Sequence, residues 1–402
     1  MTTSLPSLTL TFVYREIFAL QERGYQIETV SMNRPAADEV SEEARHLLSS
    51  TAFLDGISWP RQILSLVQTM LFSPRAIIAL LRVYFFARPM SGSRDYLRLA
   101  YHLIEACDLY QRYKHTTIDH IHCHFISGPT SIGLFLATLM GVEFSFTMHA
   151  SLIWKDPIAL VNKLDLCRFC VSISEYNKTF VLQTYGEHYR EKIHIVHCGT
   201  ATARNTSRVD RLDSQKKTSA SLRLLGIGQL TERKGFLTLI EACYYLNCEG
   251  VDFHCHIVGE GAQRQQLEQR IDEFNLQARV TLVGALAQEA IPPYLHSADL
   301  FVLPCVIAAD GLRDGIPVAL MEAMQYQLPV ISTDILGLAE LIDHGVNGLL
   351  VEPRAPRALA DAIARLAADP CTRAHYGAAA AEKVAMHFNT AKSAEQLDRL
   401  FS

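Results

Sequence analysis

Residues 313–324 read RDGIPVALMEAM, and this stretch carries the strongest indication of the fold. Pro317 suits the first position of a helix, where its missing N–H costs no hydrogen bond. The sequence therefore predicts a short buried helix over 318–325, with Asp314 in the preceding loop and Glu322 more than one turn inside. In an arbitrary helix, Asp314 would be a capping acid that stabilises the helix dipole, and Glu322 would be partly exposed. The surrounding chain has to decide between this structural role and a binding role.

Outward from this helix, short apolar strands alternate with helical segments, which is typical of parallel sheets with helices on both faces. In the second half the predicted strands are 222–226, 253–258, 280–283, 300–304 and 330–332, and the other predicted helices are 236–245 and 263–274. In the first half strands are expected at 27–32, 119–124, 144–149, 169–173 and 193–196, and helices at 12–23, 59–113 and 129–140. Ligands of such sheets bind beyond the carboxyl ends of the strands.

The polar segment 200–220 lacks an apolar period and is predicted to be a linker. It separates an N-terminal, acceptor-side domain over 1–199 from a nucleotide-binding domain over 221–380. A last helix over 381–402 is expected to cross back to the first domain. The predicted fold is α/β, with two doubly wound, Rossmann-like domains that face each other across a cleft.

Composition excludes several classes of protein. The chain has 402 residues, of which 49% are hydrophobic and 20% charged, and its net charge of −5 gives no nucleic-acid signature. Ten cysteines include one C-x-x-C pair, Cys167 and Cys170, without the second pair of a zinc site. Thiols in a reducing cytoplasm are the simplest account of them. We find no signal peptide and no apolar run of about 20 residues, so no spanning helix is expected.

The turn in LLGIGQLTERKGF, residues 224–236, follows a predicted strand. Gly228 belongs to an incomplete dinucleotide fingerprint, because Thr231 stands where the third glycine is needed, which weakens a nicotinamide reading. Arg233 and Lys234 instead provide adjacent cations ahead of a helix, suited to phosphate oxygens. A solvated pair of charges is the structural alternative.

Two further turns lie at the same predicted sheet edge. In IVGEGAQR, Gly259 and Gly261 let a ligand approach the backbone, although an ordinary strand-to-helix turn also uses such glycines. Gly315 and Pro317 place a helix N-terminus there, which is a natural anion site. Together, the three turns indicate a diphosphate flanked by carboxylates that can hold hydroxyls, as in a sugar nucleotide.

The succession of these motifs resembles the retaining GT-B glycosyltransferases of glycosyltransferase family 4, of the bacterial exopolysaccharide and colanic-acid type. The resemblance covers nearly the whole chain. It is most specific over GIGQLTERKG, IVGEGAQR, VTLVG, YLHSADLFVLPC and DGLRDGIPVALMEAMQYQLPVIST. The family pattern of two glutamates separated by seven residues is matched here by Asp314 and Glu322.

The resemblance implies a role for each matched position. Glu322 would hold the ribose hydroxyls, Asp314 the donor-sugar hydroxyls, and Arg233 with Lys234 the departing diphosphate. His149, at the tip of a first-domain strand, would face the transferred sugar. The remaining nucleotide-binding positions would be Gly228, Gly259, Gly261, Gly284, Gly315, Ile316, Pro317 and Glu340.

The chemistry implied is a same-side substitution in which the departing phosphate helps to deprotonate the acceptor. No second carboxylate is evident as a nucleophile, unlike in the retaining hydrolases. Neither a metal nor another cofactor is required. His120, His122 and His124 share one face of a strand and could bind a metal, yet the resemblance makes an H-x-H-F strand structural or cleft-lining. Ser151 lacks the G-x-S-x-G elbow of a hydrolase.

Three features depart from the family pattern. Asp314 is one methylene shorter than glutamate, Gln327 stands at a glycine position, and only MTTSL precedes a stretch that normally follows the first strand. The first strand is therefore expected to be missing, through a misassigned start, a truncated gene or a tolerated loss. An inactive GT-B protein that binds nucleotide or a partner enzyme is the alternative to an active transferase. A phosphorylase would need a lysine-bound pyridoxal phosphate, which no feature signals.

Residues 57–98 carry six arginines and a single acid among many apolar residues. Basic amphipathic helices of this kind lie on anionic membranes, so peripheral membrane contact is expected here. The alternative is an apolar hairpin packed on the first domain with its arginines outward. The sequence thus predicts a cytoplasmic enzyme at the inner face of the cytoplasmic membrane. It would move a sugar from a UDP- or GDP-sugar to a glycan or lipid-linked acceptor in surface-polysaccharide assembly.

Overall fold

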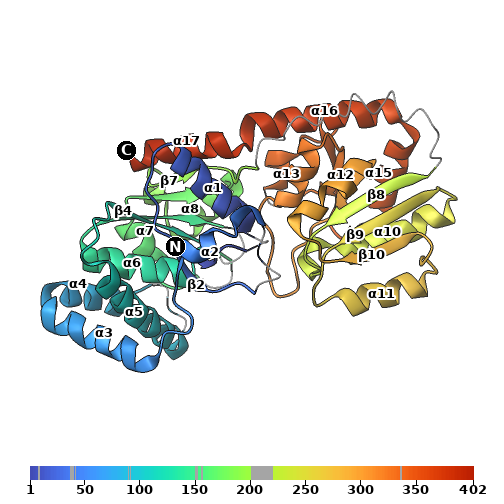
Figure 1. The fold of residues 1–402 in the computed structure, drawn as a ribbon. Coiled ribbons are helices and arrows are strands. Elements are labelled where there is room, and N and C mark those ends of the chain that lie inside the picture. Colours follow the sequence, from blue (N-terminus) through green and yellow to red (C-terminus); the bar gives the residue numbers. More distant parts are fainter. Residues whose placement is uncertain are drawn as a thin grey trace. The chain divides into compact units, whose positions relative to one another are not determined.

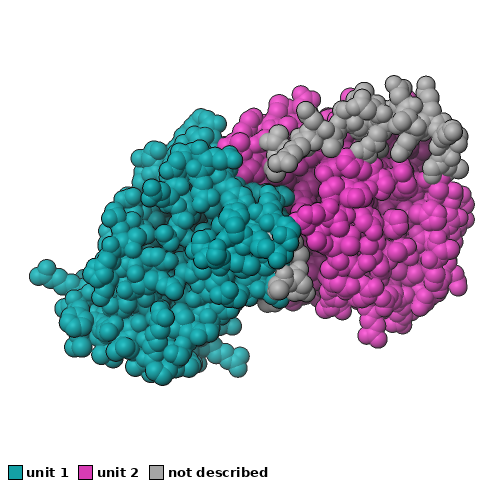
Figure 2. Space-filling model, viewed as in Figure 1, with its two compact units in different colours: residues 1–197, 394–402 teal, residues 198–393 magenta. Residues whose placement is uncertain are grey.

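A computed structural model describes residues 1–7, 10–36, 40, 42–88, 90, 92–149, 153–154, 157–200, 221–335 and 337–402. It divides into two compact units (Figure 2). Unit 1 comprises residues 1–197 and 394–402, and unit 2 comprises residues 198–393. Each unit has parallel strands and helices, which confirms the predicted α/β class. Apart from Thr200, the predicted linker lies outside the described residues.

Unit 1 has two parallel sheets. The first has the order β1 (Thr2–Ser4), β2 (Val30–Asn33) and β3 (Ala52–Phe53), and the second runs β4 (His120–His124), β5 (Glu143–Met148), β6 (Phe169–Ser172) and β7 (Ile193–Ile195). The backbone of Met1 joins β1 to β4, since its N–H donates to His122 O at 2.7 Å and its carbonyl accepts from His124 N at 2.8 Å.

The expectation of a missing first strand is wrong, because β1 pairs in parallel with β2. The strand is three residues long, and Thr2 lies opposite Ser31. So short a strand leaves little apolar pattern in the sequence, and backbone pairing with β2 and β4 holds it in place. Unit 1 contains a pocket of about 650 Å³. One wall is the segment that precedes β2, a second wall is β4, and a third is α1 (Thr11–Glu22).

The other helices of unit 1 are α2 (Leu47–Ser50), α3 (Trp59–Phe72), α4 (Pro74–Phe85), α5 (Ser93–Tyr113), α6 (Gly128–Met140), α7 (Leu160–Leu166), α8 (Glu175–Tyr185) and most of α17 (Thr390–Phe401). The predicted helical stretch 59–113 is thus three helices. Pro74 opens α4 and bends the chain, since a residue before proline avoids the helical region. α1 and α17 lie side by side (Figure 1), where Tyr25 Oη donates to Asp398 Oδ1 at 2.7 Å.

Unit 2 contains one six-stranded parallel sheet with the order β10-β9-β8-β11-β12-β13. Its strands are β8 (Leu222–Ile227), β9 (Phe253–Val258), β10 (Val280–Gly284), β11 (Leu300–Leu303), β12 (Val330–Thr333) and β13 (Gly348–Val351). β11 is a continuous apolar run, and every residue of β11 and β12 is buried, as is typical of a parallel sheet with helices on both faces. From β8 the chain winds outward to β10, then returns to β11 and winds the other way. The order therefore switches between β8 and β11, where doubly wound sheets bind ligands.

The helices of unit 2 are α10 (Phe236–Cys248), α11 (Arg264–Glu273), α12 (Pro292–Ser297), α13 (Val318–Gln325), α14 (Leu338–Leu341), α15 (Pro356–Ala368) and α16 (Pro370–His387). α13 has the predicted bounds, but Pro317 stands at its N-cap, one position before the first helical residue. Gln327 has φ +55°, in the left-handed region that favours glycine. Glycine suits this position of the family pattern because it adopts a positive φ readily. Glutamine adopts the same backbone conformation here at a cost in free energy.

Candidate active site

Two cations and a carboxylate meet at the switch point of unit 2. Arg233 and Lys234 follow β8, and Asp314 lies in the loop that follows β11. Arg233 Nε is 3.1 Å from Asp314 Oδ1, and Lys234 Nζ is 2.9 Å from Asp314 Oδ2. The three side chains are 25%, 13% and 16% exposed. The cluster keeps one net positive charge in a half-buried setting, where charge interactions are stronger than in bulk water.

The loop after β11 is fixed to the turn after β8 by contacts that the sequence analysis missed. Val306 N donates to Arg233 O at 2.9 Å, and Ala309 N donates to Glu232 Oε2 at 3.0 Å. Arg354 Nη2 donates to Glu232 Oε1 at 2.8 Å, and this hydrogen bond holds the pKa of Glu232 below its ordinary value. The loop that carries Asp314 is therefore held to the turn after β8 by several hydrogen bonds.

Cys305 begins the same loop and is fully enclosed. Burial, with the nearby Asp314 carboxylate, raises the pKa of its thiol to about 12. The thiol is therefore neutral at physiological pH, and it adds no charge to the cluster formed by Arg233, Lys234 and Asp314. The site thus presents an anion with two cations whose positive charge is only half balanced.

The glycines predicted for ligand approach also lie where loops approach each other closely. A Cβ on Gly259 would come within 1.9 Å of Gly228 O, and one on Gly261 within 2.5 Å of Leu230 O. The N–H of Gly228 donates to Val258 O at 3.0 Å, and that of Gly259 donates to Gly284 O at 2.8 Å. The loops after β8, β9 and β10 are thereby joined into one wall, in which the N–H groups of Gly228 and Gly259 are already hydrogen-bonded within the protein.

Glu322 lies on α13 and is half-buried. Its Oε1 accepts a hydrogen bond from Gln288 Nε2 at 3.1 Å. Gln288 follows β10 at the same sheet edge and was not singled out in the sequence, where it is an ordinary polar loop residue. Gln288 therefore offsets part of the desolvation of Glu322 within the protein, and the ribose-binding role of Glu322 stays a prediction.

The remaining second-unit positions lie at the same edge of the sheet. Gly315 precedes α13, and Ile316 and Pro317 are buried under its first turn. Gly284 ends β10 with φ +91°. Glu340, on α14, follows β12 and is half-buried. The structure therefore brings Arg233, Lys234 and Asp314 into direct contact and places these other positions on neighbouring loops.

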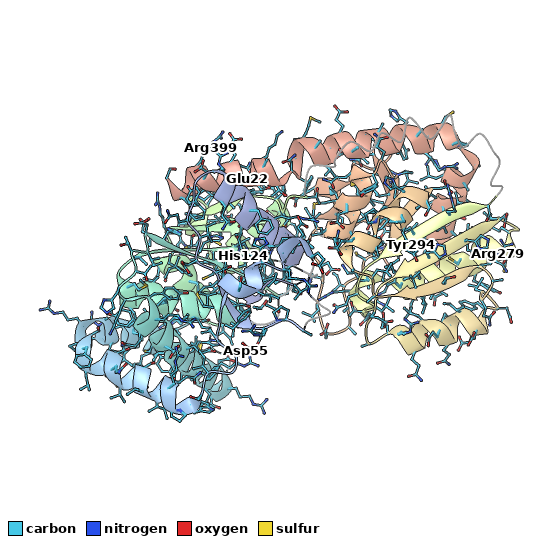
Figure 3. All side chains as sticks on the ribbon, in the orientation of Figure 1. Glu22, Asp55, His124, Arg279, Tyr294 and Arg399 are labelled. Atoms are coloured by element: carbon cyan, nitrogen blue, oxygen red, sulfur yellow. The ribbon has the colours of Figure 1, made fainter. Side chains whose placement is uncertain are left out.

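His149 lies in unit 1, directly after β5, and is buried. Its Nε2 is 3.2 Å from Nδ1 of His124, which Figure 3 labels, and the rings of Phe12 and Phe125 pack against it. Burial, with His124 adjacent, lowers the pKa of His149 well below its ordinary value. A neutral imidazole is better suited to a hydrogen bond with a hydroxyl group than to an ion pair.

The three strand histidines have hydrogen-bonding neighbours. His124 Nε2 is 3.4 Å from Glu16 Oε1, while the ring nitrogens of His122 lie 2.7 Å from Ser145 Oγ and 2.9 Å from Thr147 Oγ1. Ligand atoms of Glu16, His122 and His124 lie within 4.8 Å of one another, a spacing that could hold a metal ion. Contacts with the two hydroxyl groups satisfy both ring nitrogens of His122 without a metal ion. That the protein requires no metal stays a prediction. Ser151 lies outside the described residues.

Residues 210–383 match the family described as Glycosyl transferases group 1, and this range contains all the predicted site residues except His149. The amylovoran biosynthesis glycosyltransferase AmsK of Erwinia amylovora is 43% identical over 183 residues, or 44% of this chain and 45% of AmsK. WcaL of Salmonella typhimurium, named for colanic acid biosynthesis, is 36% identical over 211 residues, or 52% of this chain and 51% of WcaL. The chain thus spans about half the length of these relatives.

Solved structures resemble the whole fold. A glycosyltransferase from Rickettsia africae matches with a TM-score of 0.66 at 16% identity, over 100% of this chain and 97% of that chain. HepE of Anabaena, solved with UDP and glucose, matches with a TM-score of 0.62 at 20% identity, over 78% of this chain and 83% of that chain. At such identities the likeness shows the fold alone, and it confirms the predicted GT-B class.

Proposed function

We propose that this chain, whose residues 210–383 belong to the group 1 glycosyl transferases, is a retaining transferase of bacterial surface-polysaccharide assembly. The donor is a nucleoside-diphosphate sugar, and the acceptor is a glycan or a lipid-linked sugar. The transfer takes place at the cytoplasmic face of the membrane. The names of AmsK and WcaL, which refer to amylovoran and colanic acid, support the pathway class, and the UDP complex of HepE supports the donor class.

One observation carries the proposal: Arg233 and Lys234 converge on Asp314 at the switch point of the sheet. A diphosphate brings more negative charge than one carboxylate, so it competes with Asp314 for both cations. Asp314, once released, is an acceptor for sugar hydroxyls beside the diphosphate. The same three side chains thereby serve the empty and the occupied site.

In the transfer, the bond between the anomeric carbon and the diphosphate oxygen breaks, and both electrons stay on the oxygen. The acceptor hydroxyl oxygen bonds to the anomeric carbon from the same side, and its proton passes to the departing phosphate. Arg233 and Lys234 stabilise the charge that develops on that phosphate. Glu322 holds ribose hydroxyls, and contact of His149 with the transferred sugar stays a prediction. The reaction needs neither a metal nor an organic cofactor.

Binding of the donor nucleotide tests the proposal most directly. We expect one of UDP, GDP or ADP to raise the melting temperature of the purified protein, because a ligand of the folded state stabilises it. At 100 times its Kd the gain is about 2.7 kcal/mol, or roughly 5–10 °C for a unit of this size. Thermal denaturation against each nucleotide provides the measurement. No shift with any of the three would contradict the proposal and favour an inactive protein.

Lengthening Asp314 tests whether its short side chain fits this site. Because its carboxylate already contacts both cations, Asp314→Glu moves the charge by about 1.5 Å and breaks one contact. We expect kcat/KM to fall roughly tenfold, equivalent to about 1.4 kcal/mol. Asp310→Glu, in the same loop but exposed, is the matched control and should retain activity. A higher rate in Asp314→Glu would instead identify the aspartate as a lesion.

A further inference from the structure

Helix α3 is packed with its polar side inward. Its buried residues are Gln62, Ser65 and Thr69. Leu66 is half-buried against the core, but the other large apolar side chains of the helix are exposed, and they are Trp59, Ile63, Leu64, Val67, Met70, Leu71 and Phe72. Leu71 and Phe72 are 68% and 77% exposed. This reverses the usual arrangement of a surface helix, in which the apolar side faces the core.

Specific polar contacts hold α3 in this orientation. Arg61 Nε donates to Asp108 Oδ1 at 3.1 Å, and Ser65 Oγ donates to the same atom at 2.9 Å. Gln111 Nε2 donates to Thr69 Oγ1 at 2.9 Å. Asp108 is only 2% exposed, so its loss of hydration makes these partners necessary. The apolar side of α3 therefore faces outward because its polar side is hydrogen-bonded to α5.

Helix α4 extends the apolar surface. Ile77 and Leu80 anchor it in the core, while its outer side exposes Ile78, Leu81 and Phe85, followed by Phe86. α3 and α4 lie at one end of unit 1 (Figure 1) and are bent by 114°. Among the described residues, no single helix is long and apolar enough to cross a membrane. Within the same residues, α3 and α4 taken together are the one bent pair that has this length and composition.

The exposed charged residues of 57–98 have one sign. All six arginines of residues 57–98 are exposed, and they are Arg61, Arg75, Arg82, Arg88, Arg94 and Arg98. The one acid of this segment, Asp95, is buried. The segment thus presents positive charge on a chain whose net charge is −5. Exposed apolar side chains and arginines on the same segment complement the acyl region and headgroups of an anionic bilayer.

We propose that the α3–α4 surface, meaning the exposed apolar residues of 59–86 with Arg75 and Arg82, binds anionic lipid bilayers. Its apolar side chains enter the interface between headgroups and acyl chains, and the arginines bind the headgroups. The protein lies on the bilayer without crossing it. This inference stands on unit 1 alone and does not depend on the nucleotide site of unit 2.

Sedimentation with vesicles tests the proposal. We expect the protein to bind vesicles of phosphatidylcholine mixed with phosphatidylglycerol, and to bind pure phosphatidylcholine at least tenfold more weakly. Leu71→Ser with Phe72→Ser and Phe85→Ser should reduce binding at least tenfold, and Arg75→Ala with Arg82→Ala should remove the preference for anionic lipid. These side chains are exposed, so melting temperature and nucleotide response should not change. Leu166→Ser with Val346→Ser, which are exposed elsewhere, form the matched control.

Trp59 reports insertion directly, because it begins α3 and is 60% exposed. Trp154 is the other tryptophan, so Trp154→Phe leaves Trp59 as the sole indole. We expect its emission to shift to the blue with anionic vesicles. Equal binding by the wild type and the serine variant would overturn the proposal. A dimer without lipid that the serine variant dissociates would also overturn it, since the surface would then bind a second copy.

Discussion

Replacing Arg233 and Lys234 together with alanine will lower kcat/KM by about 1,000-fold or more, because each donor to a developing charge contributes about 3–4 kcal/mol. Both act on one departing group, so their effects will not add fully. The melting-temperature shift with the donor nucleotide should disappear as well. Product formation under saturating acceptor, together with thermal denaturation with and without nucleotide, gives the two readouts. The loss of both would tie binding and turnover to the same two cations.

The control for this double change must separate the loss of charge from the loss of the site. Arg357 and Lys383 also lie in unit 2, and each pairs with an acid, Glu249 and Asp343. Arg357→Ala with Lys383→Ala therefore removes equal charge and should leave turnover within a few fold. If Asp314 destabilises the double alanine variant, the triple variant Arg233→Gln, Lys234→Met, Asp314→Asn keeps a neutral cluster. Near-normal turnover in a folded variant that lacks both cations would disprove the assignment.

Local signals explain why much of unit 2 could be predicted. The helix over 318–325 has a proline ahead of it and an apolar run within it, and these are properties of neighbouring residues. Arg233, Lys234 and Asp314 were placed at one sheet edge because each follows a predicted strand. That Asp314 contacts both cations could not be predicted, since it depends on the β8–β11 pairing and on contacts such as Val306 N to Arg233 O.

Interactions between distant residues account for what was missed. Gln288 and Glu322 are 34 residues apart, and Glu232 and Arg354 are 122 apart, so neither pairing leaves a local pattern. The amphipathic period of α3 defines two sides of a helix but not which of them faces the protein. Asp108, 47 residues after Arg61, decides that question. Strand β1 was missed because it has only three residues.

Glu322→Ala will lower kcat/KM about 100-fold, since a hydrogen bond to a charged group contributes about 1.5–3 kcal/mol, and the carboxylate is proposed to hold ribose hydroxyls. The half-buried side chain contacts Gln288, so Gln288→Ala is the matched control, expected to cost less than tenfold. Donors that lack the 2′- or 3′-hydroxyl provide the sharper measurement. The wild type should discriminate against them, and Glu322→Ala should treat them nearly like the full donor, because the carboxylate that recognises the hydroxyls is gone. If the variant is slow yet still discriminates, Glu322 supports the fold of α13 and another residue holds the ribose.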